Sequence, residues 1–164
     1  MNEYELSAKL VAELTKRSMK IASVESCTAG LISKIITDAA GSSEVFDLGI
    51  TTYSNEMKTK MVGVPAEILA AHGAVSPETA QAMAEGIRRV SGADIGVATT
   101  GIAGPGGGTP EKPVGLVYTA IATMSGTEVT RLMLDKPGAD RASIRQAAAE
   151  TVLTNVLQYL ERMQ

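Results

Sequence analysis

The sequence predicts a layered α/β fold formed by a single domain, and three observations support this. Apolar residues repeat with helical period in several segments, and short β-branched segments with the length of strands lie between them. This alternation continues along most of the chain, which is typical of helices that cover a sheet. The 164 residues, 45% of them hydrophobic, suffice for one sizeable core but hardly for two. We therefore expect one domain over residues 1–164.

The first part of the chain is predicted to alternate between helix and strand. Leu6, Leu10 and Leu14 recur at helical spacing, and a short apolar segment before Glu25 has the character of a strand. The helical period returns after a run of small residues and stops at a glycine and serine turn. The predicted elements are a helix at 3–18, a strand at 21–24, a helix that follows 26–30, and a strand at 45–53.

The rest of the chain continues the pattern and ends with a hairpin and a long helix. Pro77 after Ser76 indicates a helix start, since proline is favoured at the first helical position. Two β-branched segments separated by a short Ser-Gly-Thr turn indicate a hairpin. The predicted elements are short helices at 56–62 and 66–71, a helix at 77–91, a strand at 95–100, a loop at 101–113, strands at 114–124 and 128–134, and a helix at 140–162.

Composition excludes several classes of function. The net charge is -3 and the 15 Lys and Arg residues are scattered, so we expect no nucleic-acid partner. The first twenty residues carry many charges and no later apolar run could span a bilayer, which favours a cytoplasmic protein without a membrane contact. One cysteine and one histidine leave no cluster for zinc, so we expect no metal site.

Ser26 is the most informative candidate for a catalytic role. It lies between a predicted strand and a predicted helix, where free backbone N–H groups can stabilise an oxyanion. Serine is also a favoured helix N-cap, and the sequence by itself favours that simpler role. Cys27 is the alternative nucleophile, because a helix N-terminus lowers the pKa of a thiol, although a buried structural cysteine is the commoner case.

A serine nucleophile needs a general base, and two residues are candidates. His72 lies at the predicted end of a short helix, a position more typical of capping than of catalysis. Otherwise the base is a lysine or a carboxylate, and Lys58 follows the end of a predicted strand. A lysine can act as a base once burial lowers its pKa. Most lysines are exposed on helix surfaces, and nothing in the spacing overturns that simpler interpretation of Lys58.

Two further features suggest a site for a phosphate group. The glycine-rich loop at 101–108 has Gly101 and Gly106 at Walker spacing, but Gly107 stands where that motif needs lysine. A mobile loop and a loop that covers substrate both remain open. Arg141 and Arg145 share one face at a helix start and could hold a phosphate there, although exposed arginines are common.

Seven short segments resemble, in the same order, the CinA C-terminal family, and together they span nearly the whole chain. They are 24–30 (VESCTAG), 41–43 (GSS), 52–58 (TYSNEMK), 72–76 (HGAVS), 100–105 (TGIAGP), 112–115 (KPVG) and 140–141 (DR). The chain departs from the family pattern in two places. Ala29 replaces a frequent glycine, and we expect no disturbance of Ser26 because alanine is a good helix former. Ala139 separates Gly138 from the last segment, which leaves Arg145 as an alternative to Arg141.

The resemblance implies an α/β/α sandwich with a mixed sheet, a homodimer, and the activity of a stand-alone nicotinamide-nucleotide amidase without the family's N-terminal domain. That activity is the hydrolysis of nicotinamide mononucleotide to nicotinic acid mononucleotide and ammonia, a step of pyridine nucleotide recycling, and no metal or organic cofactor is implied. The implied catalytic residues are the nucleophile Ser26, the base Lys58 and the positioning or proton-relaying Tyr53. The expected substrate-binding residues are Thr28, Thr100, Gly101, Arg141 and Arg145.

Two other functions remain open. One is a nucleotide-binding or regulatory module that hydrolyses nothing, but binding alone does not require Ser26, Lys58 and Tyr53 together. The other is an amidase or esterase for a different small substrate, because a serine and lysine pair attacks acyl groups in general.

Overall fold

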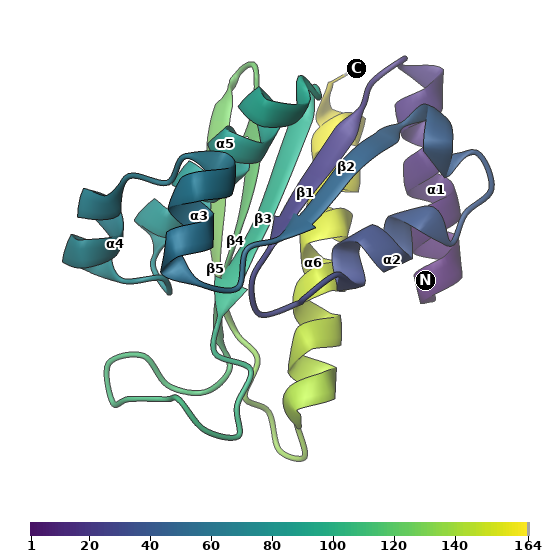
Figure 1. The fold of residues 1–164 in the computed structure, drawn as a ribbon. Coiled ribbons are helices and arrows are strands. Elements are labelled where there is room, and N and C mark those ends of the chain that lie inside the picture. The colour runs from purple at the N-terminus through teal and green to yellow at the C-terminus, as the bar shows by residue number, and fades with distance from the viewer. Residues whose placement is uncertain (164) are drawn as a thin grey trace.

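The protein folds around a mixed five-stranded sheet with helices on both faces, as Figure 1 shows. The computed structural model describes residues 1–163. The strand order is β2-β1-β3-β4-β5, in which β1 is parallel to β2 and β3, and β4 is antiparallel to β3 and β5. The predicted layered α/β fold with a mixed sheet is therefore confirmed. The strands are β1 (Ile21–Glu25), β2 (Phe46–Thr51), β3 (Ile95–Gly101), β4 (Leu116–Thr123) and β5 (Gly126–Met133).

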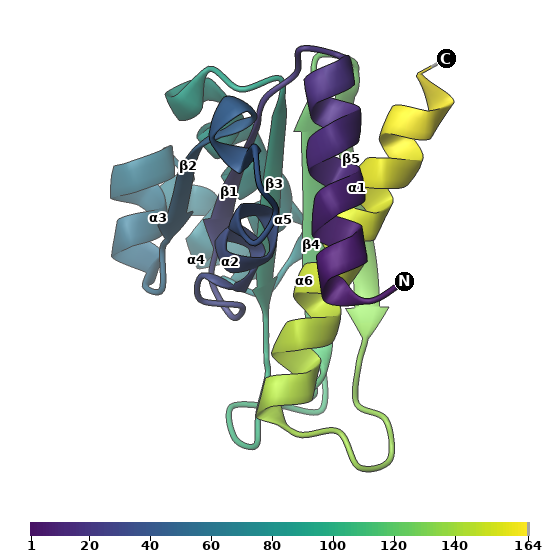
Figure 2. The same cartoon turned by 90° about the vertical axis from the view of Figure 1, so that its right-hand side faces the viewer.

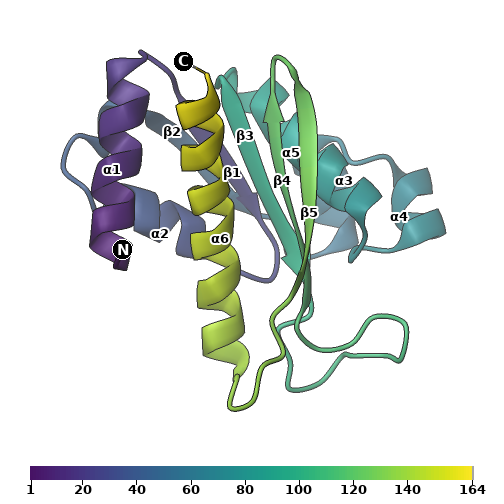
Figure 3. The same ribbon diagram turned by 180° about the vertical axis from the view of Figure 1, so that it is seen from behind.

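The helices form two layers, which Figure 2 shows on opposite sides of the sheet. One face is covered by α1 (Glu3–Lys16), α2 (Leu31–Thr37) and α6 (Arg141–Arg162), and Figure 3 shows α1 and α6 side by side there. The other face is covered by α5 (Pro77–Ser91), with α3 (Asn55–Val62) and α4 (Ala66–His72) packed against α5. A 3-10 turn, η1 (Ser42–Glu44), precedes β2.

The two faces of the sheet have different cores. Large apolar residues fill the face under α1, α2 and α6, among them Ile21, Ile95 and Val97. The face under α5 is lined by small residues such as Ala22 and Ala98, which lets α5 approach closely. At Gly96 an added Cβ would lie 2.3 Å from the Ala84 carbonyl oxygen, so only glycine fits this contact.

Most predicted elements lie within a few residues of the observed ones, and the differences have local causes. The strand expected at 45–53 begins at Phe46, because residues 42–44 form the 3-10 turn and the Val45 N–H is bonded within it, to the Ser42 carbonyl. The predicted hairpin is confirmed as β4 and β5. No helix within residues 1–163 is long and apolar enough to cross a membrane.

Candidate active site

The three parallel strands end at one edge of the sheet, at the bottom of Figure 1, and a cavity of about 190 Å³ lies there. Segments that follow β1, β2 and β3 line it, and the start of α6 closes one side. Ligand sites of α/β proteins occur preferentially at this edge. The lining residues are Ser26, Cys27, Tyr53, Asn55, Lys58, Ala74, Val75, Thr100, Gly101, Ala103 and Arg141.

Lys58 and Ser26 form the central contact of this cavity. Lys58 Nζ lies 3.1 Å from Ser26 Oγ and donates a hydrogen bond of 2.7 Å to the Thr52 carbonyl oxygen. Helix α3 begins after its N-cap Ser54, and this start places Lys58 on the inward face of the helix. The Lys58 side chain is almost fully buried, so the exposed position that spacing also allowed is not the observed one.

The surroundings of Lys58 favour its neutral form. Burial lowers the pKa of Lys58 below the ordinary value for lysine. Within residues 1–163 no carboxylate forms an ion pair with it, and the neighbouring Cys27 thiol raises the pKa by less than burial lowers it. An amine with a lowered pKa that touches a serine hydroxyl has the arrangement of a general base and its nucleophile.

Ser26 lies in a loop, so the expectation that it starts or caps a helix is wrong. Helix α2 begins at Leu31, and its N-cap is Gly30, which has φ 100° and provides no side-chain cap. Ala29 has φ 47°, so it too is left-handed and lies outside the helix. The helix-former argument for Ala29 is therefore also wrong. The loop is joined to β3 by a 3.0 Å hydrogen bond from the Ser26 N–H to the Thr99 carbonyl.

Glu25, at the end of β1, provides the missing cap of α2. Its carboxylate accepts hydrogen bonds from the N–H groups of Gly30, Ile32 and Ser33. These N–H groups are thus occupied and do not form the oxyanion site that the sequence suggested for the helix start. Sequence reasoning missed Glu25, because Ser26 offered a capping side chain closer to the predicted helix and because the Gly30 N-cap is known only from the structure.

The alternative nucleophile and the alternative base are less suited to catalysis. Cys27 is buried, and this burial raises the pKa of its thiol to about 12, so the reactive thiolate is scarce near neutral pH. His72 is the last residue of α4, lies outside the cavity, and places Nδ1 3.7 Å from the half-buried Glu78 carboxylate.

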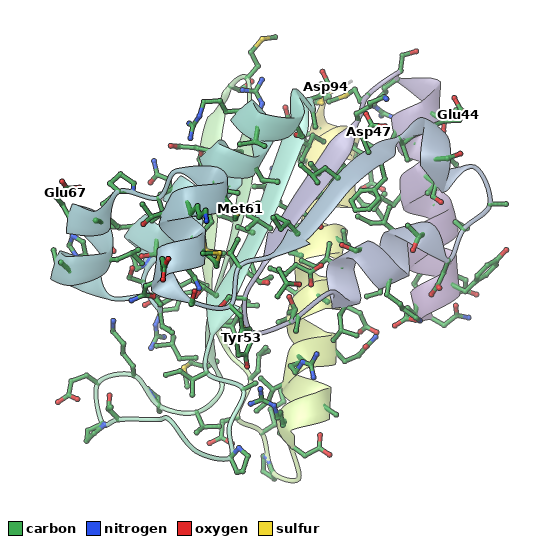
Figure 4. All side chains as sticks on the ribbon, viewed as in Figure 1. Glu44, Asp47, Tyr53, Met61, Glu67 and Asp94 are labelled. Carbon is green, nitrogen blue, oxygen red and sulfur yellow. The ribbon has the colours of Figure 1, made fainter. Side chains whose placement is uncertain are left out.

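Tyr53 and Arg141 meet at the mouth of the cavity. Arg141 Nη2 donates to the Tyr53 hydroxyl at 3.0 Å, and Nη1 donates to the Gly104 carbonyl at 2.7 Å. The Tyr53 side chain is largely exposed, and Figure 4 shows it below the sheet, above the glycine-rich loop. Arg141 therefore links the segment after β2 to the loop after β3.

Arg145 lies in a second, adjoining cavity of about 520 Å³, which shares Ala103 and Arg141 with the first. Its Nη2 donates to the Thr28 carbonyl at 3.1 Å, while its Nε is buried without a hydrogen-bond partner. The carboxylate of Asp140 also borders this cavity, and a hydrogen bond from the Ser143 N–H lowers the pKa of Asp140. The second cavity is thus lined by two arginines and one aspartate.

The two threonines expected to bind substrate have their hydroxyls bonded within the protein. Thr100 lines the first cavity, and its hydroxyl donates to the Ala74 carbonyl at 2.7 Å. Thr28 is fully buried outside the cavity lining, with its hydroxyl 2.7 Å from the Glu25 carboxylate and 2.6 Å from the Thr99 hydroxyl. Of the predicted site residues, the structure brings together Ser26, Tyr53, Lys58, Thr100, Gly101 and Arg141.

Asn55, Ala74 and Val75 also line the cavity, although sequence reasoning assigned them no role. All three lie in segments of the family resemblance, which was the signal available for them. Within the described residues 1–163, no three His, Cys, Asp or Glu side chains are grouped as a metal-ion site would require.

Fold and site define a single-domain α/β/α protein with a serine and lysine pair at the carboxyl edge of its parallel strands. The family model described as CinA C-terminal domain matches residues 3–160. The chain belongs to this family, as the resemblance of its segments predicted.

Known proteins of this family are similar over the whole chain. A competence-damage inducible protein of Caldanaerobacter subterraneus is 49% identical over 164 residues, which are 100% of this chain and 39% of that protein. The chain thus spans about two fifths of the length of that relative. The crystal structure of competence/damage inducible protein CihA from Agrobacterium tumefaciens has a TM-score of 0.91 and 41% identity, covering 97% of this chain and 95% of that one. Competence damage-inducible protein A from Klebsiella pneumoniae has a TM-score of 0.94 and 33% identity, and each chain is covered completely.

Proposed function

We propose that the protein hydrolyses the carboxamide of nicotinamide mononucleotide to nicotinic acid mononucleotide and ammonia. The observation that carries the proposal is the 3.1 Å approach of Lys58 Nζ to Ser26 Oγ, with the lysine buried. An amide is a poor electrophile, so its hydrolysis needs an activated nucleophile and an acid for the leaving nitrogen. One lysine with a lowered pKa can serve in both steps.

In the proposed reaction, neutral Lys58 takes the proton of Ser26 as Oγ attacks the carboxamide carbon. The resulting Lys58 ammonium then gives this proton to the departing nitrogen of the tetrahedral intermediate, so that the C–N bond breaks, ammonia leaves and an acyl-enzyme remains. Water, activated by Lys58, hydrolyses the ester and releases the carboxylate product. The N–H groups of Cys27 and Thr28 have no acceptor within the described residues, so we propose them as the donors that stabilise the oxyanion.

The two adjoining cavities support a substrate with a reactive amide at one end and an anion at the other. We propose that the pyridine carboxamide enters the smaller cavity beside Ser26, and that the phosphate lies in the larger one near Arg141 and Arg145. Guanidinium groups are well suited to phosphate because they donate two parallel hydrogen bonds. In this proposal Tyr53 keeps Arg141 at the boundary between the two cavities.

Ammonia release tests the proposal directly. The purified protein is incubated with nicotinamide mononucleotide, nicotinamide riboside or nicotinamide, in the presence of a chelator. We expect the mononucleotide to be the best substrate and Ser26→Ala to abolish turnover, while Ser125→Ala, a change on the exposed β4–β5 turn, leaves it unchanged. Binding of the mononucleotide without ammonia release would instead indicate a nucleotide-binding module. Preference for another small amide would indicate a different amidase.

A further inference from the structure

The carboxylate of Glu25 is fully buried and forms no ion pair within the described residues. It accepts five hydrogen bonds, all from the segment that directly follows it. The donors are the Thr28 hydroxyl at 2.7 Å and the Gly30 N–H at 3.0 Å, followed by the Ile32 N–H at 3.1 Å, the Ser33 N–H at 3.0 Å and the Ser33 hydroxyl at 3.1 Å. One side chain therefore fixes both the interior and the end of the loop that carries Ser26.

This loop needs such a restraint because its backbone is strained. Ala29 has φ 47°, a left-handed conformation in which the Cβ atom of an alanine is crowded. Its neighbours Thr28 and Gly30 are both bonded to the same Glu25 oxygen, Oε2, so the strained residue lies between two points of attachment. Without them, Ala29 would relax towards a commoner conformation and the loop would change its path.

We propose that Glu25 is a positioning residue for the nucleophile: its carboxylate holds residues 26–30 so that Ser26 Oγ stays within reach of Lys58. Glu25 is not among the cavity-lining residues, so it acts through the loop and not on substrate. A helix cap alone would require only the N–H groups of α2, whereas Glu25 also binds the Thr28 hydroxyl inside the loop. The inference rests on the proposed function, in which Ser26 is the nucleophile.

The test uses Glu25→Gln, which keeps the shape of the side chain but replaces one accepting oxygen with a donating NH₂ group. That group would face N–H donors, so the loop loses part of its attachment. The matched control is Glu67→Gln, because Glu67 is exposed on the outer side of α4 (Figure 4). Two rates are measured: kcat for ammonia release, and the rate at which phenylmethanesulfonyl fluoride labels Ser26, followed by peptide mass spectrometry.

We expect Glu25→Gln to lower kcat and the labelling rate together by about 100-fold, the effect of misplacing a reacting group by about 1 Å. KM changes less than kcat, since the cavity-lining residues outside the loop, among them Tyr53, Thr100 and Arg141, keep their places. Ala29→Gly, which removes the crowded Cβ, should change little in the wild type but restore part of both rates in the Glu25→Gln background. A residue that only stabilised α2 would lower the melting temperature and would leave the labelling rate of the folded protein unaltered.

Wild-type labelling of Ser26 in folded Glu25→Gln protein overturns the inference. If Glu25→Gln does not fold, Thr28→Val removes the hydroxyl that is bonded both to the Glu25 carboxylate and to the Thr99 hydroxyl, and a smaller drop in labelling is expected. A wild-type protein that labels at Ser26 but releases no ammonia from the mononucleotide refutes the proposed substrate, and the Glu25 inference is then decided by labelling alone. A wild-type protein that does neither overturns both.

Discussion

Replacement of Lys58 by methionine separates the role of its amine from its role in packing. Methionine has a similar length and no charge, so it fills the same buried volume on α3. The change removes the hydrogen bond to the Thr52 carbonyl, and an unpaired buried acceptor costs about 1–3 kcal/mol. It also removes the free-energy cost of burying the amine away from water, and this is the same burial that lowers the pKa of Lys58. The two effects oppose each other, so we expect a folded protein of near wild-type stability.

Lys58→Met should lose most of its rate of ammonia release although its folding stability changes little. A general base contributes about 10²–10⁴-fold to the rate, and Lys58 is the only amine on the Ser26 hydroxyl among the described residues. The assay is ammonia release from nicotinamide mononucleotide, with Lys60→Met as the control, because Lys60 is exposed on the same helix. Wild-type turnover by Lys58→Met, or an equal loss in Lys60→Met, would refute the reasoning.

The lowered pKa of Lys58 also determines how stability and activity of the wild-type protein depend on pH. The folded protein holds the Lys58 proton less tightly than the unfolded chain does. In the pH range between the folded and the unfolded pKa, the unfolded chain binds more protons, so the free energy of unfolding rises with pH across that window. Below it, the protonated amine destabilises the fold and cannot act as a base. We expect wild-type kcat/KM to fall towards acid with this pKa, whereas the residual rate of Lys58→Met rises with hydroxide.

Two further predictions concern substrate binding and the core. Arg141→Met should raise KM for the mononucleotide by about tenfold or more, since a phosphate contact is worth a few kcal/mol, while KM for nicotinamide riboside should change little. Arg162→Met, at the far end of α6, is the control. Equal effects on both substrates would contradict a phosphate contact. Gly96→Ala should lower the free energy of unfolding, measured in urea, by about 1–3 kcal/mol, because its Cβ would press on the Ala84 carbonyl oxygen. An unchanged midpoint of urea unfolding would show that α5 can shift.

The layered fold was predictable because its signals are local. Helical period, Ser76 and Pro77 at the start of α5, and the turn between β4 and β5 each depend on a few neighbouring residues. The start of α2 was not predictable in this way, since sequence preferences for helix capping apply only to the residue directly before the helix. Its cap is Glu25, five residues before Gly30 and on a strand, and the left-handed Ala29 lies directly before the Gly30 that this carboxylate binds.

The sequence indicated which residues lie near the candidate site, but not what surrounds each side chain there. Lys58 has the same spacing whether it faces water or protein, and only the approach of the Ser26 loop and the Thr52 carbonyl makes it a buried amine. Arg141 and Arg145 share a helix face, as their spacing indicated, yet their guanidinium groups contact different segments. Rotamers and neighbours decide this difference, and neither is encoded in sequence spacing.

The topology explains why the start of α6 reaches the same site as three strands from earlier in the chain. Strand β3 ends at the carboxyl edge, β4 runs away from that edge, and β5 returns to it. The antiparallel pair therefore brings the chain back to the cavity before α6 begins, with Arg141 as its first residue (Figure 1). A single strand after β3 would have started α6 at the opposite edge, far from Ser26. The hairpin thus contributes to the candidate site by placing the Arg141 end of α6 at the cavity, although the residues of β4 and β5 do not line the cavity themselves.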